Sequence, residues 1–525
     1  MYILTTAAPA ALAWLCISSS PVLAFIPHAR AALFDILSSS SNCWAANTTI
    51  YASGTAQFEN VTERWTLFDA PTYSAVISPG TEADLVKAVQ LARANDISFL
   101  ATGGRHGYTT TLGELQGGLE IDLGQFDTVE VDTSAKTVTL GGAVQIGQVL
   151  DPLYNAGFWM QTGSCTCPGV VGVSLGGGIG RFTGLYGLIL DGLTHVRMVT
   201  AEGEVIEASE TINPDLFWGL RGAGFNFGIV VSATYTIHEL TNSGQVMSAD
   251  MILPANMSSA YFEALQSYNG SMPELLATVT LITYSTAADD VSHGQSPKCI
   301  LQISYSAYND LKAQIIANWV YLGSEEAGRA ALAPILDLNP PTLNITEVTW
   351  PEVYYSAGWG FDYSVCQKSV ARDLYSNTVR NLSASTYDMA FSKMQTFYAD
   401  YPNARGSSVE FEIFANQAMS AVSSDLTAYP WRDALGYVSQ SYSGWATDDT
   451  TTAAAAAALA VELRKDFAAT SGYPELAVYI NYAHGDETLE QKYGADKLPR
   501  LAALKKTWDP DNVFGYNNAL PTSYP

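Results

Sequence analysis

The sequence has little positive charge. It contains 25 Lys and Arg residues against 51 Asp and Glu residues, which gives a formal charge of −26 at pH 7, and no Lys/Arg-rich run offsets this excess. A surface with this charge repels the phosphate backbone of nucleic acids and anionic lipid headgroups. We therefore expect no nucleic-acid partner.

Histidine and cysteine are also scarce, with 6 residues of each. The histidines are scattered, and neither His-Glu-x-x-His nor a paired Cys-x-x-Cys occurs, so the sequence predicts no metal site. Charged residues amount to 14% against 48% apolar residues, a composition that excludes large-scale disorder. A chain of 525 residues exceeds the size at which one hydrophobic core stops growing, so we expect two or more packed units.

Residues 1–24 are typical of a secretory signal peptide. An apolar stretch, Ala7–Ile17, is followed by small residues at Val22 and Ala24, which suit cleavage after Ala24. No Lys or Arg precedes the apolar stretch, so the alternative is an uncleaved membrane anchor. Because the stretch is short for a span of ~20 residues, we expect no stable membrane insertion once the leader is cleaved.

Other sequence features fit passage through a secretory pathway, so we expect a secreted protein or one in the pathway's lumen. Without the leader, five cysteines remain, an odd number that leaves at least one sulfur outside any intrachain disulfide; they are Cys43, Cys165, Cys167, Cys299 and Cys366. Six Asn-x-Ser/Thr sequons predict glycosylation of a secreted protein; they are Asn47, Asn60, Asn256, Asn269, Asn344 and Asn381.

Residues 69–239 are dense in glycine and short apolar runs. Ser74–Ser78 predicts a strand, Thr81 is expected to cap the next helix, and Ile97–Ala101 predicts a second strand that leads to Gly103. Two further runs, 196–201 and 204–208, predict a hairpin. This order of elements is typical of an α+β or α/β unit with its loop at a strand end.

The rest of the chain has a different composition. Over residues 240–470 glycine becomes less frequent and aromatic residues more frequent, which predicts a second domain built as a sheet with covering helices. An alanine-rich run within it, Thr452–Phe467, predicts a helix. Residues 471–525 form a third patterned segment. We therefore expect an α+β fold overall.

Glycine-rich loops allow the backbone to approach a pyrophosphate closely. Gly103 and Gly104 precede His106, and successive N–H groups of such a loop can form a nest for an anion. A second glycine-rich stretch covers residues 163–187. A Rossmann turn would need a helix directly after its glycines, and Arg181–Gly184 is a poor helix start, so an NAD fingerprint is disfavoured.

Four motifs together resemble the FAD-linked oxidases of the vanillyl-alcohol-oxidase fold with its PCMH-type FAD domain, in their berberine-bridge-enzyme-like branch. They are Gly-Gly-x-His at 103–106, Cys followed by Gly-Gly-Gly-x-Gly over 165–180, Leu-Phe-Trp-x-Leu-Arg-Gly at 216–222, and Tyr-x-Asn-Tyr at 479–482 with Asp-Pro-x-Asn-x-Phe at 509–514. The resemblance covers nearly the whole chain after the leader and is greatest to fungal oxidases of natural-product pathways. It implies a two-subdomain FAD-binding domain at 69–239, a substrate domain with an antiparallel sheet at 240–470, and a segment at 471–525 that completes the FAD site.

The resemblance also implies a covalent bond between FAD and His106. In many relatives the histidine directly follows Gly-Gly, whereas Arg105 intervenes here; this arginine is expected either to pair with the pyrophosphate or to be exposed. The other expected cofactor contacts are Gly103, Gly104, Gly107, Gly163, Gly169, Gly176, Gly177, Gly228, Ile229, Val230, Tyr479 and Asn481.

Many relatives carry a second flavin link, through a cysteine. Counting back from Gly176 without gaps places Cys165 at that position, whereas the usual Cys-Pro pair is matched by Cys167 and Pro168. Cys165 is favoured. The alternatives are a free buried thiol and a disulfide with another cysteine, and neither would abolish FAD binding through a single link.

The second tyrosine of Tyr-x-Asn-Tyr, Tyr482, often acts as general base in the family. A phenol has a pKa near ~10, so a nearby cation or donor would have to lower it; the alternative role is a core aromatic. Tyr479 and Asn481 would share one face of a regular strand and Tyr482 the other, so the chain must bend for all three to reach the flavin.

These features predict an FAD-dependent oxidase of a small organic substrate, an alcohol or a natural-product intermediate. Electrons would pass to dioxygen to give H2O2, in the context of secondary metabolism. The alternatives are a flavin dehydrogenase with another electron acceptor and a secreted flavin-binding protein without activity.

Overall fold

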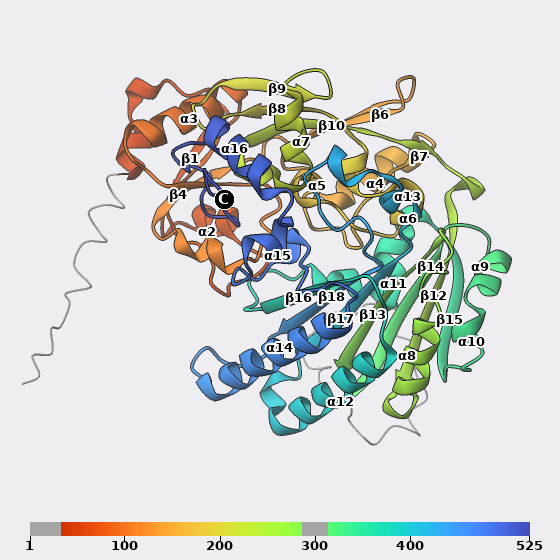
Figure 1. Ribbon diagram of the computed structural model, residues 1–525. Coiled ribbons are helices and arrows are strands. Elements are labelled where there is room, and N and C mark those ends of the chain that lie inside the picture. The colour runs from red at the N-terminus through yellow and green to blue at the C-terminus, as the bar shows by residue number, and fades with distance from the viewer. Residues whose placement is uncertain (1–32, 286–312) are drawn as a thin grey trace, which may run out of the picture.

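The computed structural model describes residues 33–285 and 313–525. The predicted signal peptide, residues 1–24, and Cys299 lie outside these ranges. Figure 1 shows two lobes: one holds the N-terminal half of the chain and the C-terminal end, and the other is built on one large sheet.

The first lobe begins with a four-stranded sheet. Its strand order is β1 (Thr49–Ala52), β2 (Tyr73–Ser78), β4 (Gly118–Asp122) and β3 (Phe99–Thr102), with β2, β4 and β3 parallel and β1 antiparallel to β2. The helix α3 (Glu82–Ala94) connects β2 to β3, and the Thr81 hydroxyl accepts a hydrogen bond from the Asp84 amide. The predicted strand, helix cap and second strand are therefore confirmed.

A five-stranded antiparallel sheet completes this lobe. Its order is β5 (Val129–Asp132), β6 (Thr137–Gly141), β10 (Ile229–Thr236), β8 (Leu193–Val199) and β9 (Val205–Ser209). The antiparallel pairing of β8 with β9 confirms the predicted hairpin. The helices α4 (Ile146–Asn155), α5 (Val170–Gly176), α7 (Pro214–Ala223) and α16 (Leu498–Trp508) contribute side chains to the hydrophobic core that includes this sheet.

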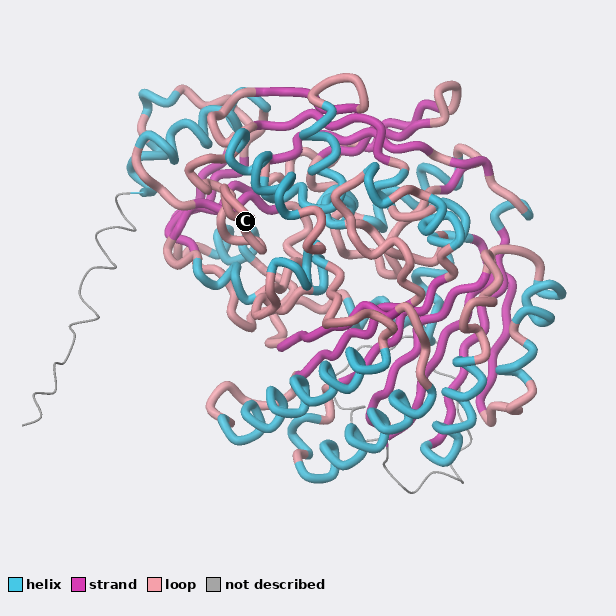
Figure 2. Tube along the Cα trace, in the orientation of Figure 1, coloured by secondary structure: helices cyan, strands magenta, loops and turns pink. Residues whose placement is uncertain are grey.

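The second lobe is a seven-stranded antiparallel sheet. Its order is β15 (Thr342–Thr349), β12 (Gln245–Pro254), β14 (Ala313–Tyr321), β13 (Leu276–Tyr284), β17 (Ser408–Phe414), β18 (Gly436–Tyr442) and β16 (Asp373–Val379). Three helices, α8 (Ser258–Gln266), α12 (Ala384–Asp400) and α14 (Thr450–Thr470), cover one face of it (Figures 1 and 2). The expected α+β class, with an antiparallel sheet and covering helices, is confirmed, and so is the helix predicted at 452–467.

Strand alternation gives the large sheet two different faces. On β17, Val409, Phe411 and Ile413 belong to the core under the helices, whereas Glu410 and Glu412 line a cavity on the opposite face. This division follows from the two-residue period of a strand, which sends neighbouring side chains to opposite faces. The face opposite these three helices thus forms one wall of a cavity between the lobes.

The C-terminal segment returns from the second lobe to the first (Figure 1). It contains α15 (Leu489–Tyr493) and α16, and its Phe514 ring packs edge-on against Phe99, with ring centroids 5.9 Å apart. The Asp509 carboxylate accepts hydrogen bonds from the amides of Val513 and Phe514, which closes a turn after α16. No helix of the described ranges is both long enough and apolar enough to cross a bilayer.

Candidate active site

A cavity of about 620 Å³ lies between the two lobes. The glycine loops of the first lobe, the face of the large sheet opposite α8, α12 and α14, and the C-terminal segment all contribute to its walls. The cavity brings together most of the residues predicted from the sequence: Gly103, Gly104, Arg105, His106, Gly107, Gly163, Cys165, Gly169, Gly228, Ile229, Val230, Tyr479, Asn481 and Tyr482.

The first glycine loop, which follows β3, has the properties of a phosphate cradle. A Cβ atom on Gly104 would lie 2.7 Å from the Gly169 amide nitrogen, so only glycine allows the two loops to touch. Within the described residues, the amides of Gly104 through Gly107 donate no hydrogen bond. Successive free N–H groups beside a cavity are suited to the pyrophosphate of a dinucleotide, so the residues present fit FAD.

The Arg105 side chain is held by two acidic residues of the first lobe. Its backbone is left-handed, with φ 55°, and its guanidinium forms ion pairs with Glu120, at 3.0 Å, and with Asp122. Both carboxylates are buried and therefore need a positively charged partner. They neutralise the guanidinium charge that was expected to meet the pyrophosphate. The alternative of an exposed side chain is therefore wrong, whereas the pyrophosphate contact at Arg105, which lines the cavity, stays a prediction.

Gly176 and Gly177 were predicted as cofactor contacts, but they lie behind the cavity wall. A Cβ atom on Gly176 would lie 2.0 Å from the Asn481 side-chain oxygen, and one on Gly177 would lie 2.8 Å from the Tyr479 ring. Both glycines therefore serve to admit the C-terminal segment. The Tyr479 hydroxyl accepts hydrogen bonds from the Gly178 amide, at 2.8 Å, and from the Asn481 side chain, at 2.7 Å, which completes this contact.

His106 lies at the edge of the cavity in a rigid setting. Its imidazole stacks on the Trp65 indole, with ring centroids 4.3 Å apart, and its Nε2 lies 3.5 Å from the Cys167 sulfur. Burial lowers the pKa of His106 to about 3, and the nearby Arg372 charge acts in the same direction. The ring is therefore neutral near pH 7, and a neutral imidazole has the free electron pair that a bond to the flavin requires.

The two candidate cysteines for a second flavin link differ in state. Cys167 forms a disulfide with Cys366, which follows α11 (Trp350–Val365), whereas Cys165 is free and lines the cavity. The disulfide joins the loop of the first lobe to the second lobe, and the Thr166 amide reinforces it with a 2.8 Å hydrogen bond to Asp362. Cys167 is thus excluded as the flavin-linking residue in this structure.

The segment Tyr479–Tyr482 bends as the motif requires. Residues Ile480–Tyr482 form a single 3₁₀ turn, closed by a 2.7 Å hydrogen bond from the Tyr482 amide to the Tyr479 carbonyl. The turn breaks strand alternation, and consequently Tyr479, Asn481 and Tyr482 all line the cavity.

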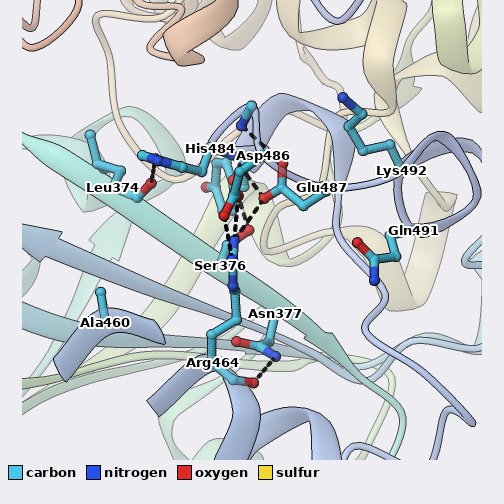
Figure 3. A network of polar contacts seen from close by, with 12 residues as sticks. Leu374, Ser376, Asn377, Ala460, Arg464, His484, Asp486, Glu487, Gln491 and Lys492 are labelled. Atoms are coloured by element: carbon cyan, nitrogen blue, oxygen red, sulfur yellow. Dashed lines mark hydrogen bonds and ion pairs between the residues drawn. The ribbon is translucent and has the colours of Figure 1, made fainter. Parts of the chain in front are cut away.

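A polar network fixes the chain just beyond this turn (Figure 3). The Ser376 hydroxyl donates to the Tyr482 carbonyl at 2.7 Å, and His484 Nδ1 donates to the Leu374 carbonyl at 2.9 Å. The Glu487 carboxylate accepts from the His484 amide at 3.0 Å. Since Ser376 and Leu374 belong to β16, the edge of the large sheet holds the segment that carries Tyr482.

The Tyr482 hydroxyl donates a 2.7 Å hydrogen bond to Glu412 Oε2. Burial and the Glu412 charge raise the pKa of Tyr482 well above its usual range. The expectation that a cation or donor lowers this pKa is therefore wrong, because the nearest strong partner is a carboxylate. Burial also raises the pKa of Glu412, and burial together with Glu412 raises that of Glu410 to about 8.

The sequence interpretation missed six charged residues that line the cavity: Arg64, Arg181, Asp362, Arg372, Glu410 and Glu412. Glu410 and Glu412 alternate with apolar residues in Ser408–Phe414, a pattern that would have placed both acids on the polar face of a strand. Arg181, in the glycine-rich stretch, lines the same cavity, and we find no sequence signal that would have singled it out.

Comparisons with known proteins assign the two segments that build much of this site to families of FAD-linked enzymes. Residues 73–209 match a family model described as FAD binding domain, and residues 478–521 match one described as berberine and berberine like. FAD-linked oxidoreductase fogF of Aspergillus ruber is 46% identical over 487 residues, which cover 92% of this chain and 93% of the relative. The chain belongs to the berberine-bridge-like FAD-linked oxidoreductases.

This FAD-linked oxidoreductase shares its fold with solved structures of lower identity. BBE-like 1 of Physcomitrella patens gives a TM-score of 0.77 at 22% identity, over 91% of this chain and 98% of that chain. A glucooligosaccharide oxidase of Acremonium strictum, whose structure is described as revealing a novel flavinylation, gives 0.73 at 23% identity, over 91% and 97%. The predicted family and the PCMH-type fold are confirmed.

Proposed function

We propose that this FAD-linked oxidoreductase is a secreted oxidase of small organic alcohols, including natural-product intermediates. The substrate alcohol becomes a carbonyl compound as dioxygen becomes H2O2, so two electrons and two protons leave the substrate. FAD, when bound, supplies the hydride acceptor and delivers the electrons to dioxygen. The observation that carries the proposal is the Tyr482–Glu412 hydrogen bond inside the cavity that also contains His106 and the glycine loops.

The Tyr482–Glu412 pair provides a route for the hydroxyl proton. Loss of hydride from the carbinol carbon requires a base for that proton. A phenol with a raised pKa is a poor base alone, but its oxygen can take the substrate proton while its own proton passes to the Glu412 carboxylate. Glu412 is thus the proton acceptor of the pair, and Tyr482 is the group that contacts the substrate hydroxyl.

His106 is proposed to hold the cofactor covalently, with Cys165 as the site of a second link. The neutral imidazole, the free thiol of Cys165 and the position of both residues in one cavity support this assignment. The flavinylation named for the Acremonium strictum structure also supports it. A covalent link retains the cofactor outside the cell, where lost FAD is not replaced.

Secretion and glycosylation belong to the same proposal. All six sequon asparagines are exposed. The disulfide Cys167–Cys366 fits an oxidising compartment. Sequencing of the mature protein should find Phe25 at its N-terminus, and peptide mapping after N-glycosidase treatment should convert occupied sequon asparagines to aspartate. An intact leader without glycans would contradict the proposed localisation.

The test is anaerobic mixing of the purified yellow protein with a panel of primary alcohols, followed by admission of air. Bleaching of the flavin and one H2O2 per alcohol consumed are expected. Bleaching with reoxidation by a quinone dye but not by air would identify a dehydrogenase. The absence of bleaching across the panel would favour the flavin-binding protein without activity.

A further inference from the structure

Arg181 is a buried cation that has no hydrogen-bond or ion-pair partner among the described residues. Its side chain lines the cavity, and the residue is only 5% exposed. Its Nε and Nη1 atoms are buried and make no hydrogen bond, and the guanidinium forms no ion pair with any residue of the described ranges. An arginine remains charged inside a protein, so an unpaired one costs free energy unless a bound group supplies the acceptor.

The other buried arginines show that this state is exceptional in this fold. The described residues include three buried arginines, Arg64, Arg181 and Arg432. Arg432 pairs with Asp191 at 2.7 Å and also donates to Thr427, and Arg64 donates to the Gly107 carbonyl at 2.7 Å. Of these three described arginines, only Arg181 forms neither an ion pair nor a hydrogen bond.

The acidic groups near Arg181 are otherwise engaged or neutral. Asp250 accepts hydrogen bonds from the Gly358 amide and from the Asn318 side chain, and Glu412 accepts from Tyr482. Glu410, whose pKa is raised to about 8, is largely protonated at neutral pH. Asp250 and Glu412 thus direct their hydrogen bonds elsewhere, and the Arg181 guanidinium retains free donors in a cavity that it shares with these carboxylates.

The remaining walls define the body of the ligand. Apolar and aromatic side chains of the large sheet and of α11 surround the same space: Val279, Leu281, Ile316, Tyr354 and Phe361. These groups suit a flat apolar molecule, and the one acceptor among them, the Tyr354 hydroxyl, is engaged with Thr162. An occupant that fits these groups and pairs with Arg181 needs an apolar body and one oxyanion.

We infer that Arg181 binds an oxyanion of the substrate, so that the preferred substrates are apolar alcohols that also carry a carboxylate or an ionised phenol. The inference rests on the proposed function, because it describes the same cavity. One molecule would present its alcohol to Tyr482 and its oxyanion to Arg181. A charge-assisted hydrogen bond in a buried site then selects acidic substrates over neutral ones of the same shape.

Calorimetric titration of the holoprotein tests this inference with matched probes. Benzoate is compared with benzamide, and 4-nitrophenolate with 4-nitroanisole, so that the two arms separate carboxylates from phenolates. We expect the anion of at least one pair to bind about tenfold or more tightly than its neutral partner. The Arg181→Met variant should lose this preference. Equal binding within both pairs, no binding of either anion, or a preference retained in the variant would overturn the inference.

Thermal stability supplies a second measurement with a matched control. Arg181→Met removes an unpaired buried charge, so the Tm without ligand is expected to rise. Arg432→Met breaks a buried ion pair at the same 5% exposure, so its Tm is expected to fall. A fall in Tm for both variants would assign Arg181 a structural role and contradict the inference.

The two proposals fail in different ways. A colourless protein, or one whose flavin is not bleached by any alcohol, would contradict the oxidase while the anion preference still reports on Arg181. A yellow, alcohol-reducible protein that binds neutral and anionic probes equally would keep the oxidase and reject the oxyanion site.

Discussion

The indole ring of Trp65 lies nearly parallel to the imidazole of His106, with planes 18° apart. The Arg372 guanidinium lies over the same indole, 4.4 Å from its centroid, so three side chains form one stack at the cavity edge. Such a stack holds the imidazole in a single orientation, and fixing a reacting group in this way lowers the entropic cost of bond formation.

His106→Ala should lose the flavin link through the imidazole. After acid precipitation, the yellow colour should stay with the wild-type polypeptide, and it should pass to the supernatant when His106 and Cys165 are both replaced by Ala. His195→Ala is the matched control, because His195 lies on β8 with a side chain that is 36% exposed. Flavin released freely from the wild type would refute covalent attachment.

Glu412→Gln should slow flavin reduction by an alcohol by about 10²-fold or more, because a positioned base contributes that much. Tyr482→Phe should have an effect of similar size. Glu410→Gln preserves the Tyr482–Glu412 hydrogen bond, so its effect should be clearly smaller. Stopped-flow absorbance under anaerobic conditions measures all three, and equal losses for Glu410→Gln and Glu412→Gln would argue against Glu412 as the proton acceptor.

The rate of flavin reduction should depend on pH through Glu412. Burial raises the pKa of this carboxyl above its ordinary value of 4.5, and only the ionised form accepts a proton. The rate should therefore fall as the pH drops through this raised pKa, and Glu412→Gln should flatten that limb of the profile. A limb that persists in the variant would have to belong to another group.

The stability of the protein should also carry a pH signature from Glu410. Its pKa is about 8 in the folded state against 4.5 as a free side chain, so folding favours the protonated form. The stabilisation that comes from protonated Glu410 is fully present below pH 4.5 and is lost as the pH rises toward 8. The Tm of Glu410→Gln minus that of the wild type should therefore increase between pH 5 and pH 8, and a constant difference would contradict the raised pKa.

Cys366→Ser should lower the stability by about 2–4 kcal/mol, since the disulfide closes a long loop. Chemical denaturation measures this loss. Peptide mapping without reduction should show Cys167 joined to Cys366 and any second flavin link on Cys165. A flavin on Cys167 instead would show that the pairing in this structure is not that of the holoenzyme.

Local patterns were sufficient for much of the fold. The strand at 73–78, the helix cap at Thr81 and the hairpin near 203 each depend on residues close in sequence, and all three were predicted. The order of the seven strands in the large sheet was not, because β13 pairs with β17 across more than a hundred residues and no short motif records that contact.

The site shows the same limit. His106, Cys165 and Tyr482 were found because each lies in a short motif, and the bend at Ile480–Tyr482 was required by that motif. The ion pairs of Arg105 could not be predicted, because Glu120 and Asp122 come close to it only through the parallel pairing of β3 and β4. Arg181 was missed because the lack of a partner is visible only in three dimensions.

In the large sheet, the side chains that stabilise the fold and those that meet the substrate cavity lie on opposite faces. Positions 408, 410 and 412 on β17, and 439 and 441 on β18, meet the cavity, while Val409, Phe411 and Val438 fill the core under the helices. Relatives can thus exchange one set of side chains for new specificities without disturbing the other. Variation confined to these cavity positions would let a single scaffold serve many chemically distinct alcohols.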